Sequence, residues 1–238
     1  MKLFLVLINL SLAFLPLETV ESASSAFSNA KIKNTFEISK TRFTSNVNGT
    51  KTELSAPQIQ VKSNLDQIYL LDPLFAVKEK NNSNKTIRAS MGHFNRLSNL
   101  IEFKKNIQIR ITSTDNNVLL NTDRLIVDNN NDTIISPSNS YFQADSFHIS
   151  SKQLTIEEFS HQQNKITFKY GSIINPDTNE RLGSAEEISY SLDSGVLIMN
   201  GQAMIKDKTI TVLADEIHYN PEDKKIIKSI NSKIINNS

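Results

Sequence analysis

The chain has 238 residues, of which 38% are hydrophobic, and its 26 basic and 25 acidic side chains leave a formal net charge of +1. This length allows one or two domains with a buried core, and the near-zero charge excludes the basic surface that nucleic-acid binding requires. The chain has no cysteine, which excludes disulfides, thiolate nucleophiles and cysteine-bound zinc.

Residues 1–22 have the order of features found in a secretory signal. A basic start at Lys2 precedes an apolar run over residues 3–17, and small residues follow as far as Ala26. This order predicts a helical signal that is cleaved after Ser22. The alternative is an uncleaved membrane anchor, although the run of fifteen residues is shorter than the roughly 20 residues that span a bilayer.

One pattern recurs along the rest of the chain. A small residue is followed three and five positions later by apolar residues, as Ala56 is by Ile59 and Val61. A second apolar position, here Ile68, lies twelve residues after most starts. Each copy predicts one unit of short strands in a stacked array. The other copies start at Ala89, Thr122, Ser151, Ala185 and Ala214.

Turn-forming sequences such as Asn46–Gly49, Asn175–Asp177 and Asn220–Asp223 separate runs that are rich in Ile, Val, Thr, Phe and Tyr. This arrangement predicts many short antiparallel strands and leaves no room for a long helix after the signal. A single helical turn is expected near residues 155–160. The fold class is therefore predicted to be all-β.

The apolar alternation changes phase at the small residue of each unit. Ile210, Val212 and Ala214 share one face of a strand, yet the next apolar residues, Ile217 and Tyr219, stand at odd offsets from Ala214. A bulge or bend at the small residue would return both sets to one side. The alternative is two strands joined by a tight turn.

Each unit exposes an apolar face that it cannot cover alone, so units must stack or two sheets must face each other. The apolar residues then form a stripe along the interior. The pattern leaves two alternatives open: a core packed dry, and a trough that stays partly open.

Several stretches carry a resemblance to known proteins. The sequences from Gly183 to Tyr190, Gly195 to Ile205 and Ala214 to Asn220 resemble the strands of LptA-like (OstA-like) proteins. Those at Ala89–Phe94, Ile101–Phe103 and Leu119–Asp128 resemble LptC. The chain thus resembles the periplasmic bridge proteins of lipopolysaccharide export, with an LptC-like part over residues 27–165 and an LptA-like extension of the same sheet over residues 166–238. LptC-like proteins usually keep their first helix as an anchor, whereas LptA-like proteins lose a signal.

The resemblance implies an open, V-shaped antiparallel β-jellyroll in the periplasm of a Gram-negative bacterium, anchored to the inner membrane if the leader is retained. Its apolar interior would hold the acyl chains of lipopolysaccharide on the way from the inner towards the outer membrane. The implied partners are lipopolysaccharide, other bridge proteins that pair with the end strands, and the inner-membrane ABC transporter complex. Head-to-tail self-association through the same end strands is also implied.

Apolar residues of the recurring pattern are the predicted lipid-binding residues, and dry core packing is the alternative for each. They are Ile59, Val61, Ile68, Leu70, Phe94, Ile101, Phe103, Leu125, Val127, Ile134, Ile188, Tyr190, Leu197, Met199, Ala203, Ile205, Ile217 and Tyr219. Lys104, Lys105 or Arg110 are candidates to meet phosphate, with a solvated strand face as the alternative.

The residue types for catalysis or metal binding are not grouped in this sequence. The four histidines are dispersed, so no metal or other cofactor is predicted. Glu186 and Glu187 are neighbours whose side chains would point to opposite faces of a strand, which suits acid/base chemistry poorly. The chain is predicted not to be an enzyme. A secreted structural or adhesive β-solenoid without lipid transport is the alternative function.

Overall fold

The computed structural model describes residues 35–47, 50–62, 66–78, 84–112, 117–128, 130–131, 133–159, 163–178, 180–192 and 194–237. These residues form eighteen strands, all paired antiparallel, and no helix. The all-β prediction is therefore confirmed, while the predicted signal or anchor helix of residues 1–22 lies outside the described residues. The strands are β1 (Thr35–Val47), β2 (Thr50–Lys62), β3 (Gln67–Leu71), β4 (Leu74–Lys78), β5 (Asn84–Arg88), β6 (Met91–Asn95), β7 (Leu100–Thr112), β8 (Asn117–Asp128), β9 (Thr133–Ser136), β10 (Ser140–Gln143), β11 (His148–Ser151), β12 (Gln153–Phe159), β13 (Gln163–Ile174), β14 (Arg181–Ser191), β15 (Leu197–Lys206), β16 (Ile210–Asn220), β17 (Lys225–Ile230) and β18 (Lys233–Asn236).

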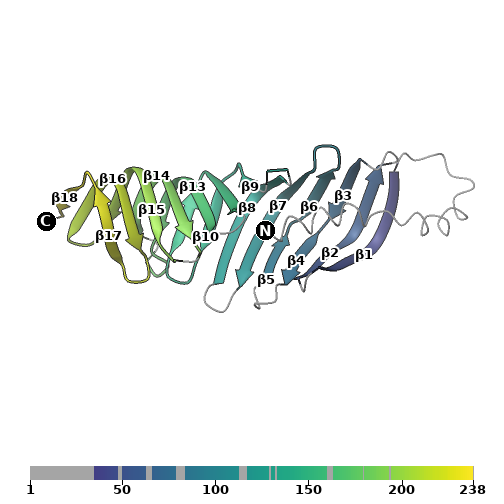
Figure 1. Ribbon diagram of the computed structural model, residues 1–238, viewed down its shortest axis with the longest axis horizontal. Coiled ribbons are helices and arrows are strands. Elements are labelled where there is room, and N and C mark those ends of the chain that lie inside the picture. The colour runs from purple at the N-terminus through teal and green to yellow at the C-terminus, as the bar shows by residue number, and fades with distance from the viewer. Residues whose placement is uncertain are drawn as a thin grey trace, which may run out of the picture.

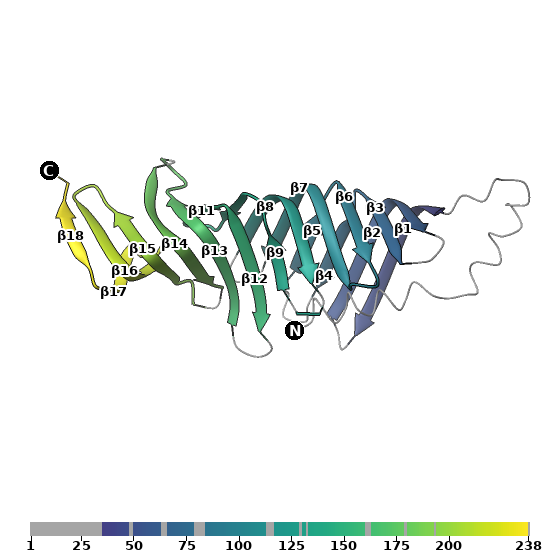
Figure 2. The same ribbon diagram turned by 90° about the horizontal axis from the view of Figure 1, so that it is seen from above.

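The sheet is folded lengthwise into two arms that meet at a corner (Figure 2). The long strands β1, β2, β7, β8, β13, β14, β15 and β16 cross the corner and belong to both arms. The short strands belong to one arm each: β3, β6, β9, β12 and β17 complete arm A, and β4, β5, β10, β11 and β18 complete arm B. The result is the V-shaped antiparallel jellyroll that the resemblance implied. The strands that cross the corner have 10 to 13 residues, however, and are not the short strands that were predicted.

The β7–β8 pair shows how a strand turns the corner. Strand β8 runs through the small residue Thr122 without a break, and the register of its pairing with β7 shifts between Lys104 and Ile107. The two residues inside this shift, Lys105 and Asn106, have left-handed backbones with φ of 64° and 51°. This geometry is a β-bulge, which bends the pair and returns the next apolar residues to the inner side.

The corner contains both arrangements that could explain the phase change, a bulge or bend within a strand and a break between two strands. Strand β16 is continuous through Ala214, opposite a bulge in β15 that contains Gly201 with φ of 72°. At Ala89 and Ser151, in contrast, one strand ends and another begins. In all these places the small residue is at most 8% exposed. A small side chain is needed because the two arms approach each other most closely there.

The helical turn expected near residues 155–160 is wrong. Thr155 to Phe159 lie in β12, which pairs with β13 on one side and β9 on the other. Leu154 and Ile156 alternate as buried residues in this strand. Pairing on both sides, together with this burial of every second side chain, stabilises the extended backbone.

Two ends of the sheet lie far apart. Figure 1 shows an elongated molecule with β1 at one end and β17 and β18 at the other. β1 pairs with β2 alone, and β17 and β18 each pair with β16. In the described residues, each end strand therefore leaves one row of backbone groups without a strand partner.

Candidate functional site

All eighteen predicted lipid-binding residues are buried between the arms, with no more than 8% of any of them exposed. Ala203 and Ile205 lie in arm B, and the others lie in arm A. The recurring pattern therefore located the inner face of one arm. It did not separate a lipid-lined interior from an ordinary core, since burial is common to both.

Most of the facing wall in arm B was missed. Its largest members are buried residues on the inner sides of β2, β4, β5, β7, β8, β10, β11 and β16, and in the turn between β10 and β11. They include Leu54, Phe75, Val77, Ile87, Ile107, Ile109, Val118, Leu120, Phe142, Phe147, Ile149 and Val212. The sequence did contain a signal for this wall. An apolar residue stands two positions before five of the six pattern starts, as Leu120 does before Thr122. Gly183, before Ala185, is the exception.

Four aromatic side chains connect the arms. Phe142 and Phe147 belong to arm B, and Phe168 and Tyr190 belong to arm A. Phe142 lies 5.1 Å from Phe168 and 5.5 Å from Tyr190, measured between ring centroids, and Phe147 lies 5.2 Å from Tyr190. These edge-on geometries are favourable for aromatic pairs. Burial raises the pKa of Tyr190, so its hydroxyl stays neutral.

The interior is packed along its length but is uncovered at both ends. Ile38 of β1 stands opposite the inward-facing Ile59, and 44% of it is exposed. Ile234 of β18 stands opposite the inward-facing Val212, and 65% of it is exposed. Packed side chains thus fill the middle of the interior, and the apolar surface continues to each end of the sheet. Contact with lipid stays a prediction.

The free rims of the arms approach each other near the C-terminal end. Asp145 and Phe147 of arm B, together with Tyr219 and Glu222 of arm A, line a hollow of about 210 Å³ between the rims. Burial, and to a smaller extent Asp207, raises the pKa of Tyr219. The hollow therefore marks a gap between the two rims.

The three cations proposed for phosphate binding are exposed on the outer side of β7. The Lys104 ammonium lies 2.9 Å from a Glu102 carboxylate oxygen, and Arg124 lies 2.7 Å from the other oxygen. Burial raises the pKa of Glu102, but hydrogen bonds from these two cations lower it more, and the net direction is down. Contact with phosphate stays a prediction, and their position agrees with the solvated-face alternative.

The described histidines contact neighbouring side chains singly, as His218 contacts Glu216 with 2.8 Å between Nε2 and Oε1. His93 stacks on Tyr69 with the ring centroids 4.6 Å apart, and burial lowers the pKa of His93. Among the described residues, no group of three or more metal-ligating side chains comes together.

The expectation that Glu186 and Glu187 point to opposite faces is wrong. Ala185 and Ile188 are both buried, so the two glutamates between them lie on the outer side, because β14 bends at this point. The two glutamates contact the strands on either side of β14. Glu186 accepts a hydrogen bond from Gln202 of β15, and Glu187 pairs with Lys169 of β13.

An antiparallel sheet folded around an apolar interior, with an unpaired edge at each end, places the molecule among open β-jellyroll proteins. Residues 3–170 match the family of LptC-related proteins of lipopolysaccharide assembly. The chain belongs to this family, whose members act in the envelope of Gram-negative bacteria, and its role lies in lipopolysaccharide transport. The match ends within β13, so the LptA-like assignment of residues 166–238 stays a prediction.

No curated protein matches the chain. In the part of the chain that the structure describes, there is no helix of the length and hydrophobicity needed to cross a membrane.

Proposed function

We propose that the interior between the arms carries the acyl chains of lipopolysaccharide through the periplasm, from the inner towards the outer membrane. The observation that carries this proposal is the continuous apolar inner face, which is buried along the molecule and uncovered at Ile38 and Ile234. The eighteen residues predicted from the sequence, with the arm B wall, are the proposed contacts. ATP hydrolysis in the inner-membrane transporter complex supplies the energy.

The free energy of hydration explains why such a carrier is needed. Each buried methylene contributes roughly 0.8 kcal/mol, so several acyl chains cannot cross water at a useful rate. Since the interior is packed in this structure, the acyl chains enter as the arms part and replace contacts such as those of Phe142 with Tyr190. The glycan then projects through the gap between the rims.

The sheet also supports a single path through both proposed modules, residues 27–165 and 166–238. Strand β13 pairs with β12 on one side and β14 on the other, through contacts such as Ile166 with Ile156 and with Tyr190. The inner face therefore passes from the LptC-like to the LptA-like part without interruption. Edge strands β1 and β17–β18 are the proposed sites for neighbouring bridge proteins, or for a second copy in head-to-tail association.

A photo-crosslinking amino acid at Phe103 or Met199 tests the lipid path. Both residues are at most 3% exposed on the inner face of arm A. Cells that express the folded variants with an active exporter are expected to yield lipopolysaccharide adducts from both positions. Leu213, which is 36% exposed on β16, is the control and should give none. If neither interior position labels lipopolysaccharide while the protein is coupled to its exporter, the structural or adhesive alternative is favoured.

Whether residues 1–22 are cleaved needs a separate measurement. We propose cleavage after Ser22, and retention of residues 1–22 would instead anchor the chain in the inner membrane. Mass spectrometry of the N-terminus of the exported protein distinguishes the two, because cleavage exposes Ala23 as the first residue.

A further inference from the structure

Exposed apolar side chains gather at the C-terminal end of the sheet. Of the thirteen large apolar side chains that are exposed in the described residues, six lie between Ile210 and Ile235. Some of them, such as Ile234, continue the apolar interior to its end. Leu213 and Ile235 lie instead on the outer side of the sheet, and they are 36% and 39% exposed. A strand added at the edge of the sheet would not cover this outer side.

Six side chains form a small grid on the outer side of arm B at this end. The grid, here called the outer C-terminal face, consists of Met204 and Lys206 of β15, Thr211 and Leu213 of β16, and Lys233 and Ile235 of β18. Leu213 stands opposite Met204 on one side and Lys233 on the other. Its neighbours in the chain, Val212 and Ala214, are buried, so Leu213 and the residues opposite it point outward.

The charge of the outer C-terminal face is positive. Lys206 and Lys233 belong to the grid, and Lys208 lies beside it in the turn between β15 and β16. In the part of the chain that the structure describes, no ion pair joins these three ammonium groups to a carboxylate. The adjacent carboxylates of Asp207 and Asp215 accept hydrogen bonds from the Lys208 backbone N–H and from a side-chain amide. Three cations thus stand beside two anions, and the cations remain available to a partner.

The residue types of this face favour a membrane over a protein as its partner. Protein interfaces are enriched in Tyr, Trp and Arg and depleted in Lys, whereas the six residues of the grid include two lysines and none of the enriched types. A lysine at a membrane surface places its apolar stem beside apolar neighbours and its ammonium group among the headgroups. Anionic headgroups attract such lysines.

We propose that the outer C-terminal face binds the surface of a membrane that contains anionic phospholipid. Met204, Leu213 and Ile235 would enter the boundary between headgroups and acyl chains, while the ammonium groups of Lys206 and Lys233 contact phosphate. The end of the sheet would then lie against a bilayer. This site does not depend on acyl-chain carriage, because it lies outside the interior.

Co-sedimentation of the full exported chain with vesicles tests the proposal. The anionic vesicles contain phosphatidylethanolamine and phosphatidylglycerol, and the neutral vesicles contain phosphatidylcholine alone. Binding to the anionic vesicles is expected to be about tenfold tighter or more, and to weaken as salt is added.

The double variant Leu213→Ser/Lys233→Gln removes one apolar and one basic contact from the face. It is expected to bind the anionic vesicles about tenfold more weakly or less. Met91→Ser/Lys104→Gln is the matched control, because Met91 and Lys104 also stand opposite each other, exposed on the outer side of arm A. It makes the same change in charge and should bind like the unmodified chain. Unfolding curves establish that both variants are folded.

A photo-crosslinking amino acid at Leu213 gives a readout in cells, where phospholipid adducts are expected. The proposal is overturned if the folded chain does not bind anionic vesicles, or if the two double variants lose affinity equally. It is also overturned if Leu213 labels an exporter component and no phospholipid, because a protein would then cover this face. Labelling of lipopolysaccharide from Phe103 and Met199 tests acyl-chain carriage separately, so the failure of one proposal is distinguishable from the failure of the other.

Discussion

At the scale of single residues, four aromatic side chains pack the two arms against each other. Phe142 and Phe168 are completely buried, and Phe147 and Tyr190 are nearly so. Their contacts join the facing arms across the interior, so each ring contributes packing that strand pairing alone does not supply. The same contacts must be exchanged if a lipid chain enters.

Phe168→Ala is expected to lower the free energy of unfolding by about 3–5 kcal/mol, because it leaves a cavity where two arms meet. Urea denaturation followed by circular dichroism measures the change. Leu97→Ala is the control, since 78% of Leu97 is exposed, and its effect should stay within about 0.5 kcal/mol. Equal losses in both variants would show that Phe168 does not join the arms.

The tyrosines provide a second test, because burial raises the pKa of Tyr190 and of Tyr219. In an absorbance titration the folded chain should ionise these two of its five tyrosines last. The unfolded chain loses these protons near pH 10. The free energy of unfolding contributed by the two neutral, buried hydroxyls is therefore fully present below this pH, and it is expected to fall as the pH rises above it.

Tyr190→Phe should remove one of the late-ionising groups from the titration and leave the other. Tyr170→Phe is the comparison, because Tyr170 is largely exposed. Removal of an early-ionising group by Tyr190→Phe would contradict the burial of this hydroxyl.

At the scale of elements, the row of small residues at the corner decides whether a strand can serve both arms. Gly171 stands opposite Ala185 in the β13–β14 pair, next to Tyr170, whose φ is 53°. A Cβ atom at Gly171 would lie 2.8 Å from Ile188 Cδ1. The space beside Gly171 at the corner is thus filled by the Ile188 side chain of β14.

Gly171→Ala is accordingly expected to destabilise the fold by about 1–3 kcal/mol through overpacking. Gly92→Ala is the matched control, since its Cβ would lie 3.2 Å from the nearest atom, Leu70 Cδ1, and a smaller loss is expected. Thermal or urea unfolding ranks the two variants. A larger loss at Gly92 would contradict the steric explanation.

The edge strand β18 carries a prediction about partners. Ile234 and Ile235 are adjacent, but Ile234 stands opposite the inward-facing Val212, and Ile235 stands opposite Thr211 on the outer side. Ile234→Glu is expected to weaken association with a neighbouring bridge protein or a second copy at least tenfold, because it places a charge on the apolar path. Ile235→Glu should have a much smaller effect.

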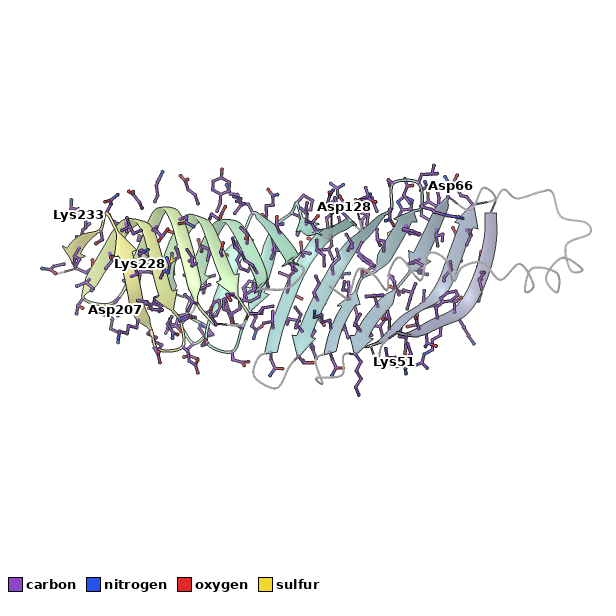
Figure 3. All side chains as sticks on the ribbon, viewed as in Figure 1. Lys51, Asp66, Asp128, Asp207, Lys228 and Lys233 are labelled. Atoms are coloured by element: carbon purple, nitrogen blue, oxygen red, sulfur yellow. The ribbon has the colours of Figure 1, made fainter. Side chains whose placement is uncertain are left out.

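Sedimentation of the chain alone, and co-purification with the exporter components, measure the association of these two variants. Figure 3 shows Lys228 and Lys233 at the same end of the molecule. An added glutamate there keeps the local charge mixed, so solubility should be preserved. Equal effects of the two variants would show that the inner face does not continue into the partner.

At the scale of the whole molecule, the proposed carriage of acyl chains through the interior requires the two arms to separate. The arms are continuous only through the corner, and their rims meet at the hollow lined by Ser146 and Glu222. A link across the rims should therefore keep the interior closed while leaving the fold unchanged.

The absence of natural cysteine makes this link simple to introduce. Ser146→Cys with Glu222→Cys, joined by a bismaleimide, is expected to abolish lipopolysaccharide labelling from Met199 while unfolding stays cooperative. Ser146→Cys with Asp177→Cys places both sulfurs in arm B and is the control, which should label normally. Undiminished labelling in the rim-linked protein would mean that acyl chains enter without separation of the arms.

Much of this molecule follows from its sequence. The pattern of small and apolar residues predicted an all-β antiparallel fold and the burial of residues such as Ile59 and Leu197, because burial on one side of a strand imposes a period of two. It also predicted a bend at Thr122 and Ala214, since the apolar phase changes there. These features are local, because they depend on residues that lie close together in the sequence.

Only the tertiary structure decided which side chains face one another across the interior. Phe142 and Tyr190 are distant in sequence and meet because the sheet folds back on itself, and the alternation of either strand alone does not specify its partner. The same folding brought the hydroxyls of Thr122, Ser136 and Ser140 together and left Ile38 and Ile234 uncovered at opposite ends. Such contacts depend on the pairing and twist of the whole sheet, which no single segment of the chain encodes.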